Sequence, residues 1–138
     1  MNLVGLLFSY QGRINRAKYW IAALIYIVLL MFLVGFYVAL PGLGFLIAIM
    51  IAYLVMVVSG FMVAIKRLHD RDKTGWWVLL FYGVPIVLSW FTLSTDGVLY
   101  AVLSVVSFVV SIWALVELGC LRGSIGPNQY GPDPVLQT

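Results

Sequence analysis

Charged residues are scarce in this chain, and their scarcity excludes an ordinary water-soluble fold. Only 9% of the 138 residues are charged and 64% are hydrophobic, whereas soluble globular domains carry roughly a quarter charged residues. A soluble protein that buried apolar segments of this length would have to be larger than this chain. Composition therefore indicates an integral membrane protein.

Cysteine and histidine occur once each, as Cys120 and His69. A single cysteine excludes an intramolecular disulfide and any metal site built from several cysteines. A metal site from His69, Asp70, Asp72 and Asp133 would lack any recognised ligand spacing. We therefore expect no metal and no cofactor. We also expect no signal peptide, because the first residues carry no basic region and the first apolar run leads into another one.

Four uncharged runs occupy residues 20–40, 43–65, 76–93 and 98–116. A membrane-spanning helix needs about 20 apolar residues, which the first two runs reach and the last two approach. Pro41 and Gly42 end the first run and favour a tight hairpin. The sequence thus predicts an all-α membrane protein in which residues 1–138 form one integral domain of four transmembrane helices, paired as two hairpins. The spacing of Leu3, Leu6, Leu7 and Tyr10 suits a short interfacial helix before them.

Basic residues gather at three places, which predicts the orientation of the chain. They lie before the first span, between the second and third, and after the fourth: Arg13, Arg16 and Lys18; Lys66, Arg67, Arg71 and Lys73; Arg122. Basic loops are retained on the cytoplasmic side. We therefore expect both termini, a central loop at 66–75 and a tail at 117–138 to be cytoplasmic. The net charge of +3 favours contact with the bilayer and its anionic lipids, and nothing indicates a nucleic-acid partner.

The central loop is the most polar stretch, with six charged residues and the histidine within residues 66–75. If the second helix continues beyond the bilayer, Asp70 lies three residues from Arg67 and four from Lys66, so that ion pairs can form along one helix face. Glu117, at the end of the fourth span, could pair with Arg122 or with a basic residue of this loop.

Three motifs, one in each polar segment, resemble those of a known family. Gly12 to Trp20 reads G-R-I-N-R-A-K-Y-W, Arg67 to Trp76 reads R-L-H-D-R-D-K-T-G-W, and Asn128 to Pro134 reads N-Q-Y-G-P-D-P. In this order they resemble the domain of unknown function 805 family, small multi-pass proteins of the bacterial inner membrane. The resemblance covers nearly the whole chain and implies membrane residence without an established activity. Lys66 and Gln129 stand where the family often has arginine, which implies fewer guanidinium groups for any bound anion.

The predicted threading places all three motifs on one side of the membrane, where nine residues could form one polar cluster. These candidate ligand-binding residues are Arg13, Arg16, Arg67, His69, Asp70, Trp76, Asn128, Tyr130 and Asp133. Arginines beside interfacial aromatic residues and glycine-rich turns suit a phosphate, from an anionic lipid headgroup or another ligand. The alternative is a structural cluster that joins the loop to the termini, with Asp70 neutralising Arg67 and His69 bonding to the tail.

Two further functions are less well supported by the sequence. An enzyme could use His69 as a general base, but no serine or cysteine nucleophile lies beside it, and we expect no catalytic activity. Four short spans could form a transporter or channel only as an oligomer, and no charged residue within the spans marks a path. A homo-oligomer or a membrane-protein partner is compatible with either reading of the cluster.

Overall fold

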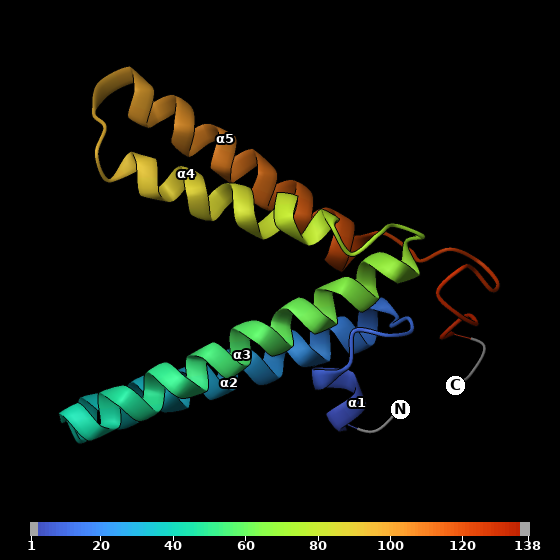
Figure 1. Ribbon diagram of the computed structural model, residues 1–138, viewed down its shortest axis with the longest axis horizontal. Helices are drawn as coiled ribbons and strands as arrows, with labels where there is room; N and C mark the ends of the chain where they lie inside the picture. The colour runs from blue at the N-terminus through green and yellow to red at the C-terminus, as the bar shows by residue number, and fades with distance from the viewer. Residues whose placement is uncertain (1–2, 136–138) are drawn as a thin grey trace.

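The chain folds into two helical hairpins that meet at one end and diverge toward the other (Figure 1). The computed structural model describes residues 3–135, and within them there is no β-sheet. The first hairpin pairs α2 (Arg16–Ala39) with α3 (Leu43–Asp70). The second pairs a π-helical turn, η1 (Leu79–Gly83), and α4 (Val84–Thr92) with α5 (Gly97–Leu115), which continues into a second π-helical turn, η2 (Val116–Cys120). A short helix, α1 (Leu3–Phe8), lies against α3.

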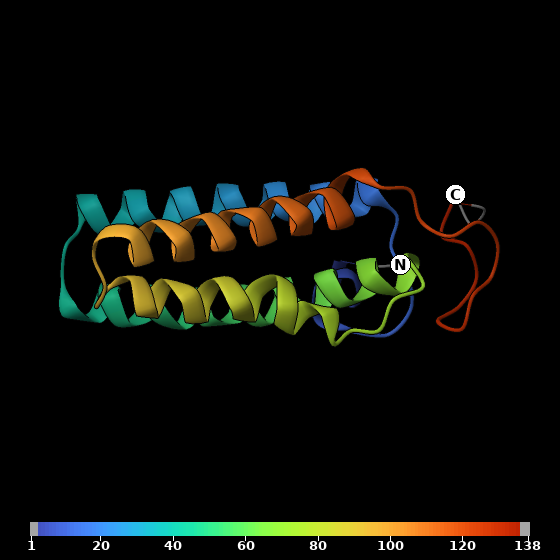
Figure 2. The same cartoon turned by 90° about the horizontal axis from the view of Figure 1, so that it is seen from above.

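Local sequence signals explain where the first hairpin begins and turns. The side chain of Asn15 caps α2 by accepting a hydrogen bond from the backbone N–H of Lys18 at 3.0 Å, as a residue of this type does at a helix N-terminus. Pro41 and Gly42 separate α2 from α3, as expected. The connections of both hairpins lie at the end opposite the tail (Figure 2). The predicted short N-terminal helix is present as α1.

Within residues 3–135, three helices are long and apolar enough to cross a membrane: Arg16–Ala39, Leu43–Asp70 and Gly97–Cys120. The helix formed by η1 and α4, Leu79–Thr92, is apolar but shorter. Along the long helices many large apolar side chains are exposed, including Met31, Leu54 and Phe108. Soluble monomers rarely expose so much apolar surface, so the all-α membrane class is confirmed. Three of the four predicted transmembrane helices are long enough to cross a membrane.

The predicted central loop at residues 66–75 is partly wrong, because α3 continues through Asp70 and the loop begins at Arg71. The end of the apolar run at Ile65 did not end the helix, since residues 66–70 find polar partners on the elements around them. Arg67 and Asp70 pair three positions apart on α3, an arrangement that supports a helix. After Arg71, Asp72 adopts a left-handed conformation with φ 55°, and the chain leaves the helix.

Pro85 coincides with the irregular part of the second hairpin, where the sequence predicts a kink. Proline has no N–H to donate and crowds the preceding turn of a helix. The π-helical turn η1 lies directly before α4, and α4 begins at Val84 with Pro85 in its first turn. Such turns widen a helix locally and often lie at functional sites.

The two hairpins are held together at one end by a small apolar core. It contains Ala64 and Leu68 of α3, Val78 and Phe81 near η1, and Ala114 and Leu118 at the end of the second hairpin. A second buried cluster, formed by Leu6, Ile14, Ala22 and Val63, packs α1 onto the first hairpin. Residues 9–18, 66–75 and 117–135 lie around this junction and are called the polar end below (Figure 1).

Candidate functional site

The centre of the polar end is a buried carboxylate between two arginines. Asp70 Oδ1 accepts from Arg13 Nε at 3.2 Å and lies 3.1 Å from its Nη2, and Asp70 Oδ2 accepts from Arg67 Nη1. The side chains of Arg13, Arg67 and Asp70 are 1%, 0% and 4% exposed. Buried charges require both a counter-ion and saturated hydrogen bonds. Whether the arginines can also bind a ligand therefore depends on the partners of their remaining N–H donors.

Backbone carbonyls take up the remaining guanidinium donors of Arg13. Its Nη1 donates to Gly126 O at 2.7 Å and to Gly131 O at 3.2 Å, and its Nη2 donates to Ser124 O at 2.7 Å. All of these acceptors belong to the C-terminal tail. Arg13 therefore connects the start of the first hairpin to the tail, and no donor is left to bind a ligand.

Arg67 is held in a similar way, chiefly by the end of the second hairpin. Its Nε donates to Leu118 O at 2.7 Å and its Nη2 to Leu121 O, while Nη1 also reaches Ile14 O at 3.4 Å. The last carbonyls of a helix lack intrahelical partners and carry partial negative charge. A guanidinium from α3 thus caps η2.

Two side chains of the first hairpin complete the capping of η2. Trp20 Nε1 donates to Gly119 O at 3.0 Å, and Arg16 Nη1 donates to Cys120 O at 3.2 Å. A methyl group on Gly119 would lie 2.8 Å from the ring of Trp20, so only glycine allows this approach. The carbonyls of Leu118, Gly119, Cys120 and Leu121 all accept from residues of α2 or α3.

The N-terminal helix is capped by α3 as well. Lys66 Nζ donates to Gly5 O at 2.7 Å and Leu6 O at 2.5 Å, and Ser59 Oγ donates to Leu7 O at 2.6 Å. Lys66 is 0% exposed and does not pair with Asp70, although the sequence spacing allowed it. The sequence contained no signal that Lys66 and Ser59 would cap α1, because their partners there are backbone carbonyls.

Glu117 joins the loop after α3 to the second hairpin. Its Oε1 accepts from Arg71 Nε at 3.0 Å and from Lys73 Nζ at 2.9 Å. Of the two pairings that the sequence allowed for Glu117, the structure has the one with basic residues of the central loop, while the backbone oxygen of Arg122 accepts from Arg71.

Asn128 and Asp133 fold the tail upon itself and onto α3. Asn128 Nδ2 donates to His69 O at 2.8 Å, and Ser124 N donates to Asp70 O at 2.7 Å. The carboxylate of Asp133 accepts from the backbone N–H groups of Gly126 at 3.0 Å and Val135 at 2.9 Å. These two backbone donors lower the pKa of Asp133 below its usual value, since they stabilise the charged form.

His69, Tyr130 and Trp76 lie outside the ion cluster. The rings of His69 and Tyr130 stack with centroids 3.8 Å apart, and His69 Nδ1 lies 3.3 Å from Gly12 O. The side chain of His69 thus contacts the tail by ring stacking, and its backbone carbonyl accepts the hydrogen bond from Asn128. Trp76 is 77% exposed and has no contact with the arginines; it lines an apolar cavity with His69.

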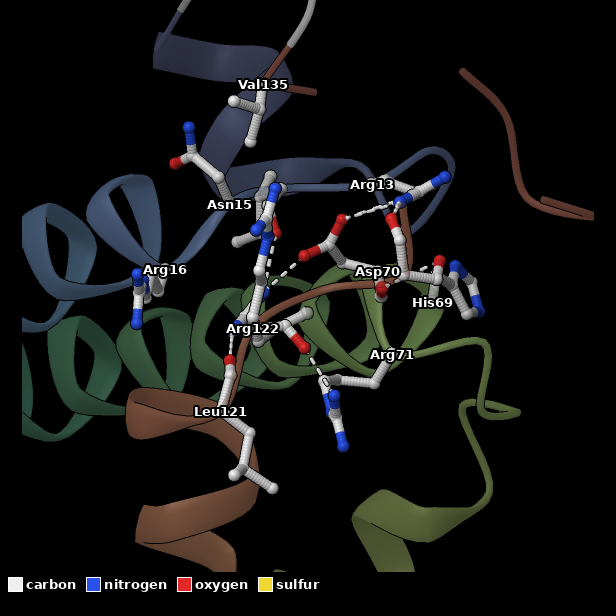
Figure 3. A network of polar contacts seen from close by, with 12 residues as sticks. Arg13, Asn15, Arg16, His69, Asp70, Arg71, Leu121, Arg122 and Val135 are labelled. Atoms are coloured by element: carbon white, nitrogen blue, oxygen red, sulfur yellow. Dashed lines mark hydrogen bonds and ion pairs between the residues drawn. The ribbon is translucent and has the colours of Figure 1, made fainter. Parts of the chain in front are cut away.

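Arg16 and Arg122 remain at the margin of the cluster, beside a polar cavity of about 300 Å³ (Figure 3). Asn15, Arg67, Asp70, Ser124 and Asp133 also line it. Arg122 is exposed, and its guanidinium makes no hydrogen bond within residues 3–135, although its charge helps to lower the pKa of Asp133. Sequence reasoning did not include Arg122 in the site, although its positive charge was the available signal. Among these residues no three metal-ligating side chains gather.

Comparison with known proteins shows the family to which the chain belongs. The model of a family described as "Protein of unknown function (DUF805)" matches residues 7–132. The chain belongs to the DUF805 family. Among its relatives in Escherichia coli K12, the uncharacterized protein YiiR is 29% identical, over 92% of this chain and 86% of YiiR. The inner membrane proteins YhaH and YhaI are 26% and 28% identical, over 94% and 91% of this chain and 89% and 86% of theirs.

No solved structure matches the chain. The family match contains the first two polar motifs and the third as far as Pro132, and the resemblance seen in the sequence is therefore confirmed. The names of YhaH and YhaI place those two DUF805 proteins in the inner membrane, which agrees with the apolar helices described above.

Proposed function

We propose that this protein is a four-span inner-membrane protein that binds the phosphate of an anionic lipid headgroup at its cytoplasmic face. In this proposal the buried cluster of Arg13, Arg67 and Asp70 is a structural clasp, and the ligand contacts are Arg16 and Arg122. We expect no catalytic activity.

The division of roles among the arginines carries the proposal. Most donors of Arg13 and Arg67 are taken up by Asp70 and by backbone carbonyls, so paired phosphate contacts with either guanidinium would have to displace bonds that hold the fold. Arg122 makes no such bond, and Arg16 makes one, to Cys120 O at 3.2 Å. Their common polar cavity has room for a phosphate group, and arginine recognises phosphate through paired N–H donors.

The orientation rests on the distribution of charge. In the structure all eight basic residues lie on one end of the hairpins, and the connections at 40–42 and 93–96 at the other end contain none. The positive-inside preference puts the polar end in the cytoplasm, next to the anionic leaflet. The shorter helix Leu79–Thr92 crosses with help from the residues of the 71–78 loop and from local thinning of the bilayer.

Thiol labelling in intact bacteria tests the orientation. In a Cys120→Ser background, a membrane-impermeant maleimide should label Thr95→Cys, in the connection of the second hairpin, and should leave Thr74→Cys unlabelled until the cells are opened. Labelling of Thr74→Cys in intact cells would invert the orientation and end the proposal of a cytoplasmic site.

Lipid retention tests the site. In nanodiscs or mild detergent, the protein should bind phosphatidylglycerol better than phosphatidylcholine, and Arg122→Gln should weaken that binding at least about tenfold, since a hydrogen bond to a charged group contributes about 1.5–3 kcal/mol. Lys18→Gln, which also removes a positive charge near the interface, is the matched control. Competition by inorganic phosphate would assign the site to a free phosphate ligand, and an unchanged preference in Arg16→Gln and Arg122→Gln would refute it.

A further inference from the structure

A second cavity, separate from the arginine site, lies between the hairpins. Its volume is about 630 Å³, within the range of small-molecule sites, and it shares no lining residue with the polar cavity. Its walls come from α3, the loop after it and η1, and the lining is almost wholly apolar: Phe61, Ile65, Gly75, Trp76, Leu79 and Ile86. The tyrosines Tyr10 and Tyr82 and the imidazole of His69 complete it.

His69 presents a hydrogen-bond acceptor to this cavity. Its Nδ1 lies 3.3 Å from the carbonyl oxygen of Gly12, and a carbonyl only accepts, so Nδ1 carries the proton. Among residues 3–135 no carboxylate pairs with His69, and its apolar surroundings favour the neutral ring. In that tautomer Nε2 is an acceptor.

The Nε2 atom has no protein partner within the described chain, and it faces the cavity. A methyl group on Gly75, which lines the cavity, would lie 3.8 Å from Nε2. Within the described residues every fully buried side-chain nitrogen or oxygen has a hydrogen-bond partner, so the unpartnered Nε2 is accessible. The stacking of His69 on Tyr130 at 3.8 Å fixes the ring in this orientation.

The other wall of the cavity is the π-helical turn. Leu79, Tyr82 and Gly83 of η1 line the cavity, and a methyl group on Gly83 would meet nothing within 4 Å. Phe61, Tyr82 and Ile86 also line a neighbouring, mainly apolar cavity of about 450 Å³ that reaches α2. The two cavities therefore adjoin, and an acyl chain could extend from one into the other.

We propose that this cavity binds a neutral acyl lipid with a free hydroxyl group. The hydroxyl donates to His69 Nε2, and the acyl chain occupies the apolar part and extends into the adjoining cavity. An ionised carboxylate or a phosphate fits less well, because it has no proton to donate to Nε2 and the cavity lining contains no arginine or lysine.

Two matched pairs test this site. The first is a pair of probes, oleyl alcohol and its methyl ether, which differ only by the hydroxyl proton. Native mass spectrometry from mild detergent should show one alcohol bound per chain and the ether binding about two- to tenfold more weakly, the worth of one net hydrogen bond. In His69→Phe, which keeps a ring against Tyr130, the alcohol should lose this advantage.

The second pair consists of variants. Gly83→Leu places an apolar side chain at the cavity wall, where a methyl group meets nothing within 4 Å, and we expect it to reduce binding of the alcohol at least tenfold. Gly35→Leu makes the same exchange in α2, where a methyl group also meets nothing within 4 Å. Gly35 is not part of the lining of this cavity, so this variant should bind as the wild type does. Both variants should keep the wild-type melting temperature.

Three results would overturn the proposal. Equal binding of the alcohol and the ether would remove the role of Nε2, and undiminished binding in Gly83→Leu would remove the cavity as the site. Preferential binding of oleate or of a long-chain hydroquinone would assign the cavity to another ligand. Loss of phosphatidylglycerol binding in Arg122→Gln is independent of all three, so the two sites are tested separately.

Discussion

Lys66 and Arg67 are consecutive residues of α3, and their side chains cap the ends of two different helices. Lys66 donates to the carbonyls of Gly5 and Leu6 in α1, and Arg67 donates to those of Leu118 and Leu121 at the end of the second hairpin. Adjacent helical residues point about 100° apart, so one turn of α3 holds α1 on one side and η2 on the other.

Replacing Asp70 should strongly destabilise the polar end. Asp70→Asn removes the negative charge between Arg13 and Arg67, whose side chains are 1% and 0% exposed. Removing one partner of a buried ion pair lowers the free energy of unfolding by about 3–5 kcal/mol. We expect a large fall in the melting temperature in detergent. Asp96→Asn, the same exchange at an exposed residue before α5, should leave it unchanged, and equal stability of both variants would contradict the clasp.

Gly123 is the point where the tail passes closest to the clasp. A methyl group there would lie 2.0 Å from Asp70 Oδ2, so Gly123→Ala must displace either the tail or the carboxylate. Overpacking of this kind costs about 1–3 kcal/mol, and the melting temperature should fall accordingly. In Gly44→Ala the added methyl group meets nothing within 4 Å, and that control should lose no stability. A wild-type melting temperature in Gly123→Ala would show that the tail is not docked as described.

The capping of α1 by Lys66 predicts a local rather than a global effect. Lys66→Met keeps the apolar stem but removes the donor to Gly5 O and Leu6 O. A hydrogen bond from a charged group contributes about 1.5–3 kcal/mol, so amide hydrogen exchange in α1 should accelerate at least about tenfold. Exchange in the interior of α5 should stay the same. In Lys18→Met, whose ammonium group has no such role, α1 should exchange as in the wild type.

The tail should respond to acid only below the usual titration range of an aspartate. The pKa of Asp133 is lowered in the folded chain from 3.8, so its stabilising effect is complete above pH 3.8 and disappears as the pH falls through the lower folded-state pKa. The amide resonance of Gly126, which donates to Asp133, should titrate in micelles with a midpoint below 3.8. A midpoint at or above that value would mean that the two backbone bonds are absent in solution, and Asp133→Asn should abolish the titration.

The sequence predicted the parts of this fold that depend on side-chain patterns. Uncharged runs located the helices, Pro41 and Gly42 located the first turn, and the spacing of Arg67 and Asp70 allowed the pair that the structure contains. It also predicted that the three polar motifs meet, because basic residues cluster at one end of the hairpins. Each of these features follows from the type of side chain and its spacing along the sequence, and both can be read before the structure is known.

The predictions that failed depend on backbone acceptors. Arg67, Lys66 and Trp20 all donate to carbonyl groups at helix ends, and every residue has a carbonyl, so the sequence cannot show which one will be in reach. For the same reason the helix appeared to end at Ile65, where its apolar run ends, although α3 continues to Asp70. Trp76 was assigned to the ion cluster because of its place in a motif, but its neighbours in space are apolar.

Because the clasp includes residues from both ends of the chain, it can be completed only after the tail has been synthesised. Arg13 and Asp70 leave the ribosome long before Ser124, Gly126 and Gly131, whose backbone groups saturate them. Both hairpins can insert as soon as each is synthesised, but their junction stays incomplete until the last residues of the chain arrive. A nascent or truncated chain without these residues therefore leaves donors of Arg13 and the backbone carbonyl of Asp70 unsatisfied at the membrane surface, a feature by which quality-control proteases could distinguish it from the finished protein.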